Sequence, residues 1–285
     1  MFSENITTLA DQAAARLAMQ KRSIPAHFVR SMLAGMYVGA AIVLIFTVGS
    51  YLPVECRRLL MGVCFGGALT IVIFAGSDLF TGFNLIMTLG TLTRKVKMTD
   101  LLANWAWTWV GNLAGSVLLA WMVIQSGVMD PDPVKSFVLG LVNTKMNIPA
   151  DQLFLRAILA NWIVCLGVWL AVRCKEEIAR ILMIWWCMFT FITCGYEHSI
   201  ANMCGLMLGY LLPHESIPTI TFTGYWYNLL WATLGNIVGG AFFVGGMYWM
   251  ASPKIREQLK AERAQLALAS LNGTAGDAEK VLAKA

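Results

Sequence analysis

Long stretches without a charged residue constrain the fold of this chain more than any other feature. Several of them reach the length of a membrane-spanning helix, about 20 residues, and the longest cover residues 31–54, 101–129 and 216–253. With 58% hydrophobic and 13% charged residues, the chain is too apolar for a soluble domain of 285 residues. The sequence therefore predicts an all-α, multi-pass membrane protein. We expect no cleavable signal, because the first 30 residues are polar and mixed in charge.

The apolar segments predict six spans. They cover about residues 29–51, 58–89, 101–126, 153–173, 177–212 and 225–250. Lys and Arg are dense before the first span and after the second, fourth and sixth, which predicts that both termini are cytoplasmic. The chain then divides into a cytoplasmic N-terminal helix (1–27), a transmembrane domain (28–252), and a cytoplasmic C-terminal helix and tail (253–285).

Both termini carry patterns of polar surface helices. Apolar residues at helical spacing predict a helix over residues 6–19, with Ser3 or Asn5 as its cap. A charged helix is expected over residues 255–271. We expect these helices to lie on the surface and to support assembly of the protein. The alternative is that the N-terminal helix acts as a gate.

The two halves of the chain resemble each other. Three short motifs recur in the same order, at offsets of 126, 119 and 124 residues. They begin at Arg30 and Arg156, at Gly76 and Gly195, and at Gly111 and Gly235. Each half holds three spans, an odd number, so the second half is expected to be inverted relative to the first. Transport proteins with a site near the middle of the membrane are built in this way.

Two of the expected spans are interrupted. Gly-rich or polar turns occur at residues 76–82 and 195–199, inside otherwise apolar segments. Backbone leaves the helical form at membrane depth only where protein or a water-filled cavity satisfies its polar groups. Each interruption also creates a new helix start, whose unpaired N–H groups and dipole favour an anion. The second and fifth spans are therefore predicted to be broken and to line a pathway.

Few polar residues lie near these breaks. His198 can donate a hydrogen bond or a proton at physiological pH, and the Thr81 hydroxyl could orient it. Lys145 is the lone cation between Lys135 and Arg156, and it would concentrate anions near a narrow mouth, unless it is an ordinary solvated lysine. The other polar residues are expected to hold the breaks in shape: Asp78, Glu197, Asn112, Asn161, Asn202 and Asn236.

Other classes of function find little support. The seven cysteines form no CxxC pair and are interpreted as small packing residues. We expect no metal site, since His198 and Glu197 lack a third ligand, and no cofactor or nucleic-acid partner. A membrane enzyme or receptor lacks a catalytic set among the three histidines, which are His27, His198 and His214. A neutral-solute channel of the aquaglyceroporin type would need paired Asn-Pro-Ala breaks.

Three motifs resemble signatures of the formate/nitrite transporter family. They are the segment from Gly195 through Glu197 and His198 to Met203, the segment Gly76–Gly82, and the segment Gly235–Gly240. The similarity runs over about residues 30–253, and within the family the chain looks most like the bacterial nitrite channels. Two departures argue against a formate channel: Gly82-Phe83 replaces a small polar pair, and Tyr196 replaces a phenylalanine.

The resemblance implies an aquaporin-like fold of six helices, assembled as a homopentamer in the bacterial inner membrane with one pore per protomer. It implies one constriction on the cytoplasmic side, formed by Leu69, Leu79 and Phe80. A second constriction, on the periplasmic side, would be formed by Phe65 and Phe191.

Between the two constrictions the resemblance places His198, with Thr81 within hydrogen-bond reach. It assigns Lys145 and Asn161 to the outer vestibule. The implied function is transport of nitrite, with His198 as a hydrogen-bond or proton donor; a formate, other small monocarboxylate or hydrosulfide channel is the alternative. Proton donation would make transport strengthen as the external pH falls. Channel and proton-coupled carrier both remain open.

Overall fold

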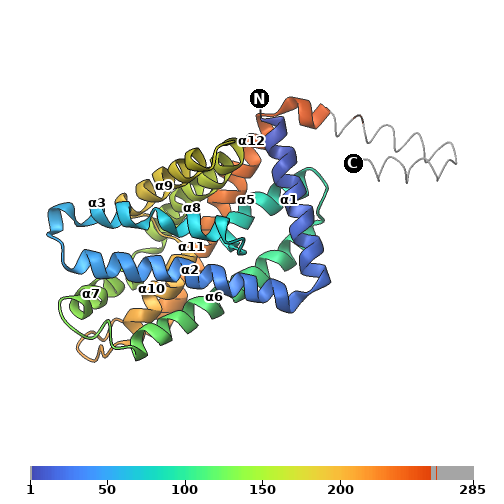
Figure 1. Ribbon diagram of the computed structural model, residues 1–285. Helices are drawn as coiled ribbons and strands as arrows, with labels where there is room; N and C mark the ends of the chain where they lie inside the picture. Colours follow the sequence, from blue (N-terminus) through green and yellow to red (C-terminus); the bar gives the residue numbers. More distant parts are fainter. Residues whose placement is uncertain (1, 258–260, 262–285) are drawn as a thin grey trace.

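The computed structural model describes residues 2–257 and 261. They form a bundle of helices that lie largely side by side, with α1 across one end of the bundle and α7 at the opposite end (Figure 1). In chain order the elements are α1 (Ser3–Arg22), α2 (Ile24–Ser50), α3 (Val54–Phe65), α4 (Gly67–Phe74), α5 (Phe80–Leu92), α6 (Met98–Gln125), α7 (Val134–Met146), α8 (Ala150–Arg173), α9 (Glu177–Thr193), α10 (Ser199–Leu211), α11 (Phe222–Ile237), the π-helix η1 (Val238–Gly246) and α12 (Met247–Met250).

Five helical segments are long and apolar enough to cross a membrane. They are Ile24–Ser50, Val54–Phe74, Met98–Gln125, Ala150–Arg173 and Phe222–Met250. Each agrees with an expected span to within a few residues at most boundaries. The expected fifth span is divided between α9 and α10, and the end of the expected second span is a separate helix, α5. Helical structure therefore stops where the sequence places the two turns.

The segment between the third and fourth expected spans contains a helix that the apolar pattern does not predict. Helix α7 has 13 residues, too few to cross a membrane. It buries Val134, Val138, Val142 and Met146, which recur every four residues along one face. The helix brings Lys145, in its last turn, into the bundle.

Glycines at four-residue spacing allow the longest helices to approach closely. A Cβ on Gly115 of α6 would lie 2.0 Å from the Met32 carbonyl oxygen of α2. In the second half, a Cβ on Gly239 would lie 2.3 Å from the carbonyl oxygen of Ile158 on α8. Backbones therefore touch at both crossings, as expected for helices that associate in lipid.

Helix α1 packs against the bundle through its apolar face. Its residues Ile6, Leu9 and Ala13 are fully buried. The expected cap is wrong: the residue that precedes the helix is Phe2, with no side-chain cap, and Ser3 already lies in the first turn. Residues 253–257 are helical, but the rest of the helix expected over 255–271 lies outside the described residues, apart from position 261.

Large apolar side chains cover the sides of the bundle. Ile71, Trp121, Trp186 and Phe242 are each about half exposed, at 49%, 53%, 54% and 52%. Exposed apolar surface of this extent is unfavourable in water and indicates contact with lipid or with another protein. Together with the five long apolar helices, it identifies a multi-pass membrane protein.

Candidate functional site

The helices before the two breaks end in the same way. Gly76 and Gly195 both have φ of 73°, in the left-handed region that glycine adopts without a steric penalty. The next N–H donates back to a carbonyl five residues earlier, from Ser77 to Val72 and from Tyr196 to Phe191, both at 3.2 Å. This pattern is the Schellman motif of helix C-termini. Each glycine thus ends its helix and redirects the chain.

An acidic residue follows each turn and is anchored to a neighbouring helix. The Asp78 N–H donates to the carbonyl of Arg30 on α2 at 3.2 Å, and the Glu197 N–H donates to the carbonyl of Arg156 on α8 at 3.3 Å. Arg30 and Arg156 begin the first of the repeated motifs. The two breaks therefore rest on corresponding positions of the two halves.

A buried asparagine ties the first break to the bundle. Asn112 of α6 accepts the Phe80 N–H at 2.9 Å through its Oδ1 atom. Its Nδ2 atom donates to the carbonyls of Ser31 and Asp78, at 2.7 and 2.9 Å. These bonds satisfy polar backbone that the break leaves without helical partners.

Asn236 of α11 makes the corresponding set of bonds at the second break. Its Oδ1 atom accepts the Ser199 N–H at 2.8 Å. Its Nδ2 atom donates to the carbonyls of Ala157 and Glu197, at 2.8 and 3.1 Å. Both asparagines are fully buried, and each holds its break in one conformation. We call these two sets of hydrogen bonds, made by Asn112 and by Asn236, the asparagine brackets.

Asp78 is surrounded by cations that the sequence did not single out. Its fully buried carboxylate accepts from Arg16 of α1 at 2.7 Å, from His27 of α2 at 3.0 Å and from Arg30 at 2.9 Å. Arg16 also donates to the Gly76 carbonyl at 3.3 Å. The first break is therefore joined to α1 and α2 by ion pairs, and its acidic residue has a structural role.

His27 connects the first break to α6. Its Nδ1 atom lies 3.0 Å from the Asp78 carboxylate, and its Nε2 atom lies 3.1 Å from the Thr108 hydroxyl. Thr108 also donates to the Asn104 carbonyl at 2.7 Å. The buried His27 ring therefore links α2, the first break and α6.

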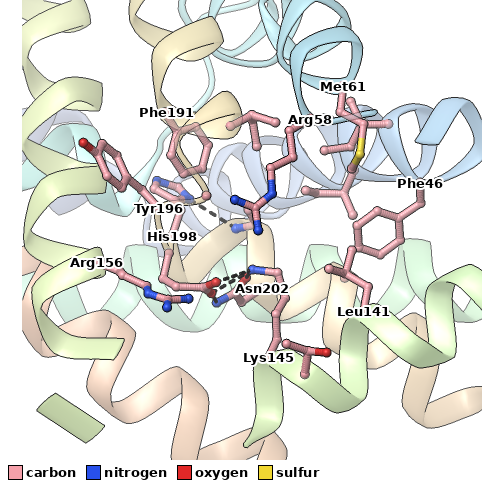
Figure 2. A pocket seen from close by; sticks show the side chains of 18 of the residues that line it. Phe46, Arg58, Met61, Leu141, Lys145, Arg156, Phe191, Tyr196, His198 and Asn202 are labelled. Carbon is pink, nitrogen blue, oxygen red and sulfur yellow. Dashed lines mark hydrogen bonds and ion pairs between the residues drawn. The ribbon is translucent and has the colours of Figure 1, made fainter. Parts of the chain in front are cut away.

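Glu197, at the second break, forms a closed network with three other residues. The Lys145 ammonium lies 2.7 and 2.8 Å from its two carboxylate oxygens and 3.1 Å from the Asn202 Oδ1 atom. Asn202 donates to Glu197 at 2.7 Å and to Asn228 at 2.8 Å, and Asn228 donates to the Lys145 carbonyl. Figure 2 shows the Lys145 side chain extending toward Asn202 in this network. The charge of Lys145 is thus compensated within the break.

His198 begins helix α10 and faces Thr81. Its Nδ1 atom accepts the Ala201 N–H at 3.2 Å, as an N-cap side chain does. In that arrangement the ring hydrogen is on Nε2, which donates to the Thr81 hydroxyl oxygen at 2.9 Å. In the described part of the chain, the Thr81 hydroxyl hydrogen has no acceptor of its own. A neutral histidine and a free hydroxyl donor therefore meet at this point.

Two cavities extend into the bundle from its opposite ends, at α7 and at α1 (Figure 1). The α7-side cavity has a volume of about 330 Å³, and its lining includes Arg58, Lys145, Arg156, Phe191, Glu197 and His198 (Figure 2). The α1-side cavity has a volume of about 250 Å³, and its lining includes Gln12, Arg16, Leu69, Leu79, Val168 and Arg180.

A small void lies between the two cavities. Its volume is about 10 Å³, roughly the space of one water molecule. Phe191 and His198 line both the void and the α7-side cavity, whereas Leu69 and Leu79 line both the void and the α1-side cavity. The three spaces thus follow one another, separated by apolar side chains.

The expected constriction residues fall into two groups. Phe65 and Phe191 lie edge to face, with ring centroids 5.6 Å apart, and both line the void with Leu69 and Leu79. Phe80 lines none of the three spaces within the described part of the chain. Its ring packs against Trp105, with centroids 6.2 Å apart.

Asn161 also lies away from the cavities, among neighbouring backbone groups. It is fully buried, and its Nδ2 atom donates to the Asn236 carbonyl at 2.7 Å and to the Asn84 Oδ1 atom at 2.9 Å, with the Thr81 carbonyl at 3.3 Å. The structure therefore places Asn161 as a link between α5, α8 and α11, in the tying role that the sequence also suggested. Among the described residues, no group of three His, Cys, Asp or Glu side chains could hold a metal ion.

The sequence profile described as "Formate/nitrite transporter" matches residues 3–250. The chain belongs to this family. It is 43% identical over 255 residues to "Nitrite transporter NirC" of Salmonella typhimurium, covering 89% of this chain and 93% of the relative. The Escherichia coli protein of the same name is also 43% identical, covering 94% of that relative. A "Probable formate transporter" of Methanothermobacter thermautotrophicus is 34% identical, covering 81% of this chain and 90% of that relative.

Solved structures agree with this membership in the formate/nitrite transporter family. A structure titled "FNT family ion channel" superposes with a TM-score of 0.84 at 41% identity, covering 88% of this chain and 99% of that chain. A "Pentameric formate channel with formate bound" gives a TM-score of 0.73 at 26% identity, covering 82% and 99%. The family and these relatives are transporters and channels, so this chain is a transport protein and not an enzyme.

Proposed function

We propose that this chain carries nitrite across the bacterial inner membrane through a pore in each protomer. The observation that carries the proposal is a row of two cavities with a small void between them, in which His198 lines both the α7-side cavity and the void and is hydrogen-bonded to Thr81. The similarity to proteins named nitrite transporters supports nitrite as the anion. The relative titled a pentameric formate channel supports a homopentamer, which native mass spectrometry in detergent would test.

In the membrane we propose six spans in two inverted, aquaporin-like halves, with both termini in the cytoplasm. The corresponding Schellman turns, arginine carbonyls and asparagine brackets at the two breaks support an internal repeat. The excess of Lys and Arg beside alternate span ends supports the orientation. The α7-side cavity then opens to the periplasm and the α1-side cavity to the cytoplasm. Residues 1–27 and 253–285 flank the transmembrane domain.

In this pathway, apolar side chains oppose a bare anion and one polar pair receives it. Phe65 and Phe191 on one side of the void, with Leu69 and Leu79 on the other, make desolvation of a charge unfavourable. His198 lines the void, whereas Thr81 lies buried beside it and, in the part of the chain that the structure describes, lines none of the three spaces. When the void widens to admit an anion at His198, the anion accepts the Thr81 hydroxyl hydrogen, while the hydroxyl oxygen stays held by the His198 Nε2–H. His198 thus polarises the donor that meets the anion.

The tautomer of His198 favours hydrogen bonding over proton donation. If neutral His198 gave up its Nε2 proton, it would become an imidazolate, a very unfavourable product. If it first became an imidazolium, its Nδ1 atom would gain a hydrogen and could no longer accept the Ala201 N–H. We therefore assign His198 as a hydrogen-bond donor to the Thr81–anion pair.

Flux into proteoliposomes tests the proposed function. Labelled nitrite should enter vesicles containing the protein faster than protein-free vesicles, and excess unlabelled nitrite should suppress the signal. Formate is the second candidate, because one relative is named a probable formate transporter. If formate competes with labelled nitrite more strongly than nitrite itself does, the protein is a formate channel. Equal flux in protein-free and protein-containing vesicles would contradict both.

A further inference from the structure

The α7-side cavity has an excess of positive charge. Its lining holds four cations, Arg57, Arg58, Lys145 and Arg156, and one carboxylate, Glu197. We propose that Arg58 and Arg156 form a capture site in this cavity for planar anions with two oxygens. The site would receive the anion before it reaches Phe191 and His198. This inference rests on the proposed function, in which the cavity is the periplasmic entrance.

Two of the four cations are already engaged. Lys145 is held by both carboxylate oxygens of Glu197. Arg57 donates twice to the Leu52 carbonyl, at 3.2 and 2.8 Å, and its guanidinium lies 4.9 Å from the centre of the Phe137 ring. Both side chains stabilise their own segments, so neither is free to receive an anion without breaking existing bonds.

The other two guanidinium groups have donors to spare. Among the described residues, the Arg58 side chain has no hydrogen-bond or ion-pair partner, and Arg156 has one long bond, to Gln152 at 3.4 Å. A Cβ built on Gly195 would lie 3.6 Å from the Arg58 Nη1 atom, so Arg58 lies directly at the second break. Figure 2 shows both arginines extending into the cavity, from different sides.

The internal repeat explains why Arg156 is available. Its counterpart, Arg30, is paired with the carboxylate of the first break, Asp78, at 2.9 Å. At the second break the same backbone bond is present, from the Glu197 N–H to the Arg156 carbonyl. The carboxylate of Glu197, however, is taken by Lys145 of α7. Arg16 of α1 contacts one Asp78 oxygen and leaves the other to Arg30, whereas Lys145 of α7 contacts both Glu197 oxygens. Arg156 is therefore left free to extend toward the cavity.

Guanidinium groups suit the anions in question. A planar fork of N–H donors matches two oxygens on one atom, as in nitrite, formate and other carboxylates. Cations lining one concave mouth also raise the local concentration of anions, and such steering is worth about 10- to 1,000-fold in association rate. Arg58 is exposed and Arg156 is partly exposed, so salt should weaken their effect.

Nitrite influx at low ionic strength tests the site. We expect the double variant Arg58→Gln/Arg156→Gln to lower influx by about tenfold when external nitrite is far below saturation. At saturating nitrite, or in about 1 M of an inert salt, where charges are screened within a few ångströms, variant and parent should converge. Arg58→Lys/Arg156→Lys keeps the charges but not the planar forks, and should recover only part of the loss. Lys135→Gln, which removes a cation outside the cavity lining, is the matched control.

Two results would overturn the capture site. One is influx by the glutamine variant equal to that of the parent at low nitrite and low salt. The other is a loss that persists at saturating nitrite and high salt, because this indicates a damaged pore. Parent vesicles that carry no nitrite would instead overturn the proposed function.

A binding measurement distinguishes failure of the capture site from failure of the proposed function. Phenylglyoxal modifies free guanidinium groups, and peptide mass spectrometry then reports each arginine separately. Added nitrite or formate should protect Arg58 and Arg156 and leave Arg173 unprotected, since Arg173 is exposed and is not part of the cavity lining. Equal protection, or none, at all three arginines would contradict the site whether or not the protein transports nitrite.

Discussion

At the scale of single residues, the two members of the Glu197-His198 pair have different tasks. The Glu197 carboxylate accepts from Lys145 and Asn202, and its carbonyl accepts from the Asn236 side chain, so Glu197 defines the shape of the break. His198 uses one ring nitrogen to begin α10 and the other to hold Thr81. Two adjacent residues in the sequence thus separate into an acid that shapes the break and a histidine that caps α10 and holds Thr81.

The role of His198 can be tested by keeping or removing its hydrogen-bonding groups. His198→Gln retains an N–H donor and a carbonyl acceptor, whereas His198→Phe retains neither. We expect nitrite flux to survive largely in the glutamine variant, with the pH dependence of the parent, and to fall strongly in the phenylalanine variant. Flux should be measured in liposomes over a range of external pH. A glutamine variant that is active but has lost the pH dependence would show that His198 transfers a proton.

Loss of Lys145 should affect stability before it affects attraction of the anion. The Glu197 carboxylate is 4% exposed, and removing its cation leaves a nearly buried charge without a partner. We expect Lys145→Ala to destabilise the protein by about 3 kcal/mol, seen as a lower melting temperature in detergent. Lys145→Ala/Glu197→Gln should recover part of that loss. A melting temperature equal to that of the parent would contradict the role assigned to this ion pair.

At the scale of helices, the fold depends on backbone contacts between α2 and α6 and between α8 and the α11–η1 helix. The same glycine spacing serves both crossings. It places the Asn112 and Asn236 side chains close enough to reach the two breaks. The geometry of the pathway is therefore set by helix packing some distance from it.

Gly115 provides a test of this packing. Its Cβ in Gly115→Ala would meet the Met32 carbonyl oxygen at 2.0 Å, so α2 and α6 must move apart. We expect a loss of about 3 kcal/mol, the upper part of the usual range for overpacking. Gly67→Ala in α4 is the matched control, because a Cβ there meets nothing within 4 Å. It should change stability by no more than about 1 kcal/mol. Equal melting of both variants would contradict the close approach.

The sequence predicts the spans, the two breaks and the asparagine brackets because each has a local signature. Apolar runs mark the spans, glycine marks the turns, and the repeated motifs align Asn112 with Asn236. Helix α7 carries no such signature, since 13 residues are too few for a span. The pairing of Lys145 with Glu197 depends on α7, as does the release of Arg156. These long-range contacts follow from how the helices fold together, and neither composition nor spacing reveals them.

At the scale of the whole molecule, the proposed pathway consists of two wide cavities and one narrow centre. The cavities have volumes of about 330 and 250 Å³, against about 10 Å³ for the void between them. Flux should therefore be limited at the centre, where two apolar barriers act in series. One barrier lies at Phe191, toward the α7-side cavity, and the other lies at Leu79, toward the α1-side cavity.

Barriers in series predict a specific pattern of mutant effects. Relieving one of them, by Phe191→Ala or Leu79→Ala, should raise nitrite flux only modestly, because the other still limits passage. The double variant should raise flux by more than the product of the two single effects. Stopped-flow measurements on liposomes with equal amounts of folded protein would check this. Single effects that simply multiply would indicate one barrier instead of two.

His198 both caps helix α10 and holds Thr81, and this combination limits which residues can replace it. His198 supplies the acceptor for the Ala201 N–H at the buried start of α10, and a residue without such an acceptor would leave that N–H without its partner, whatever anion passes. Few side chains meet this requirement and also offer a donor on the opposite side. Thr81 carries no comparable obligation within the described part of the chain. Changes in anion preference should therefore accumulate at Thr81 and around the void, while position 198 stays fixed.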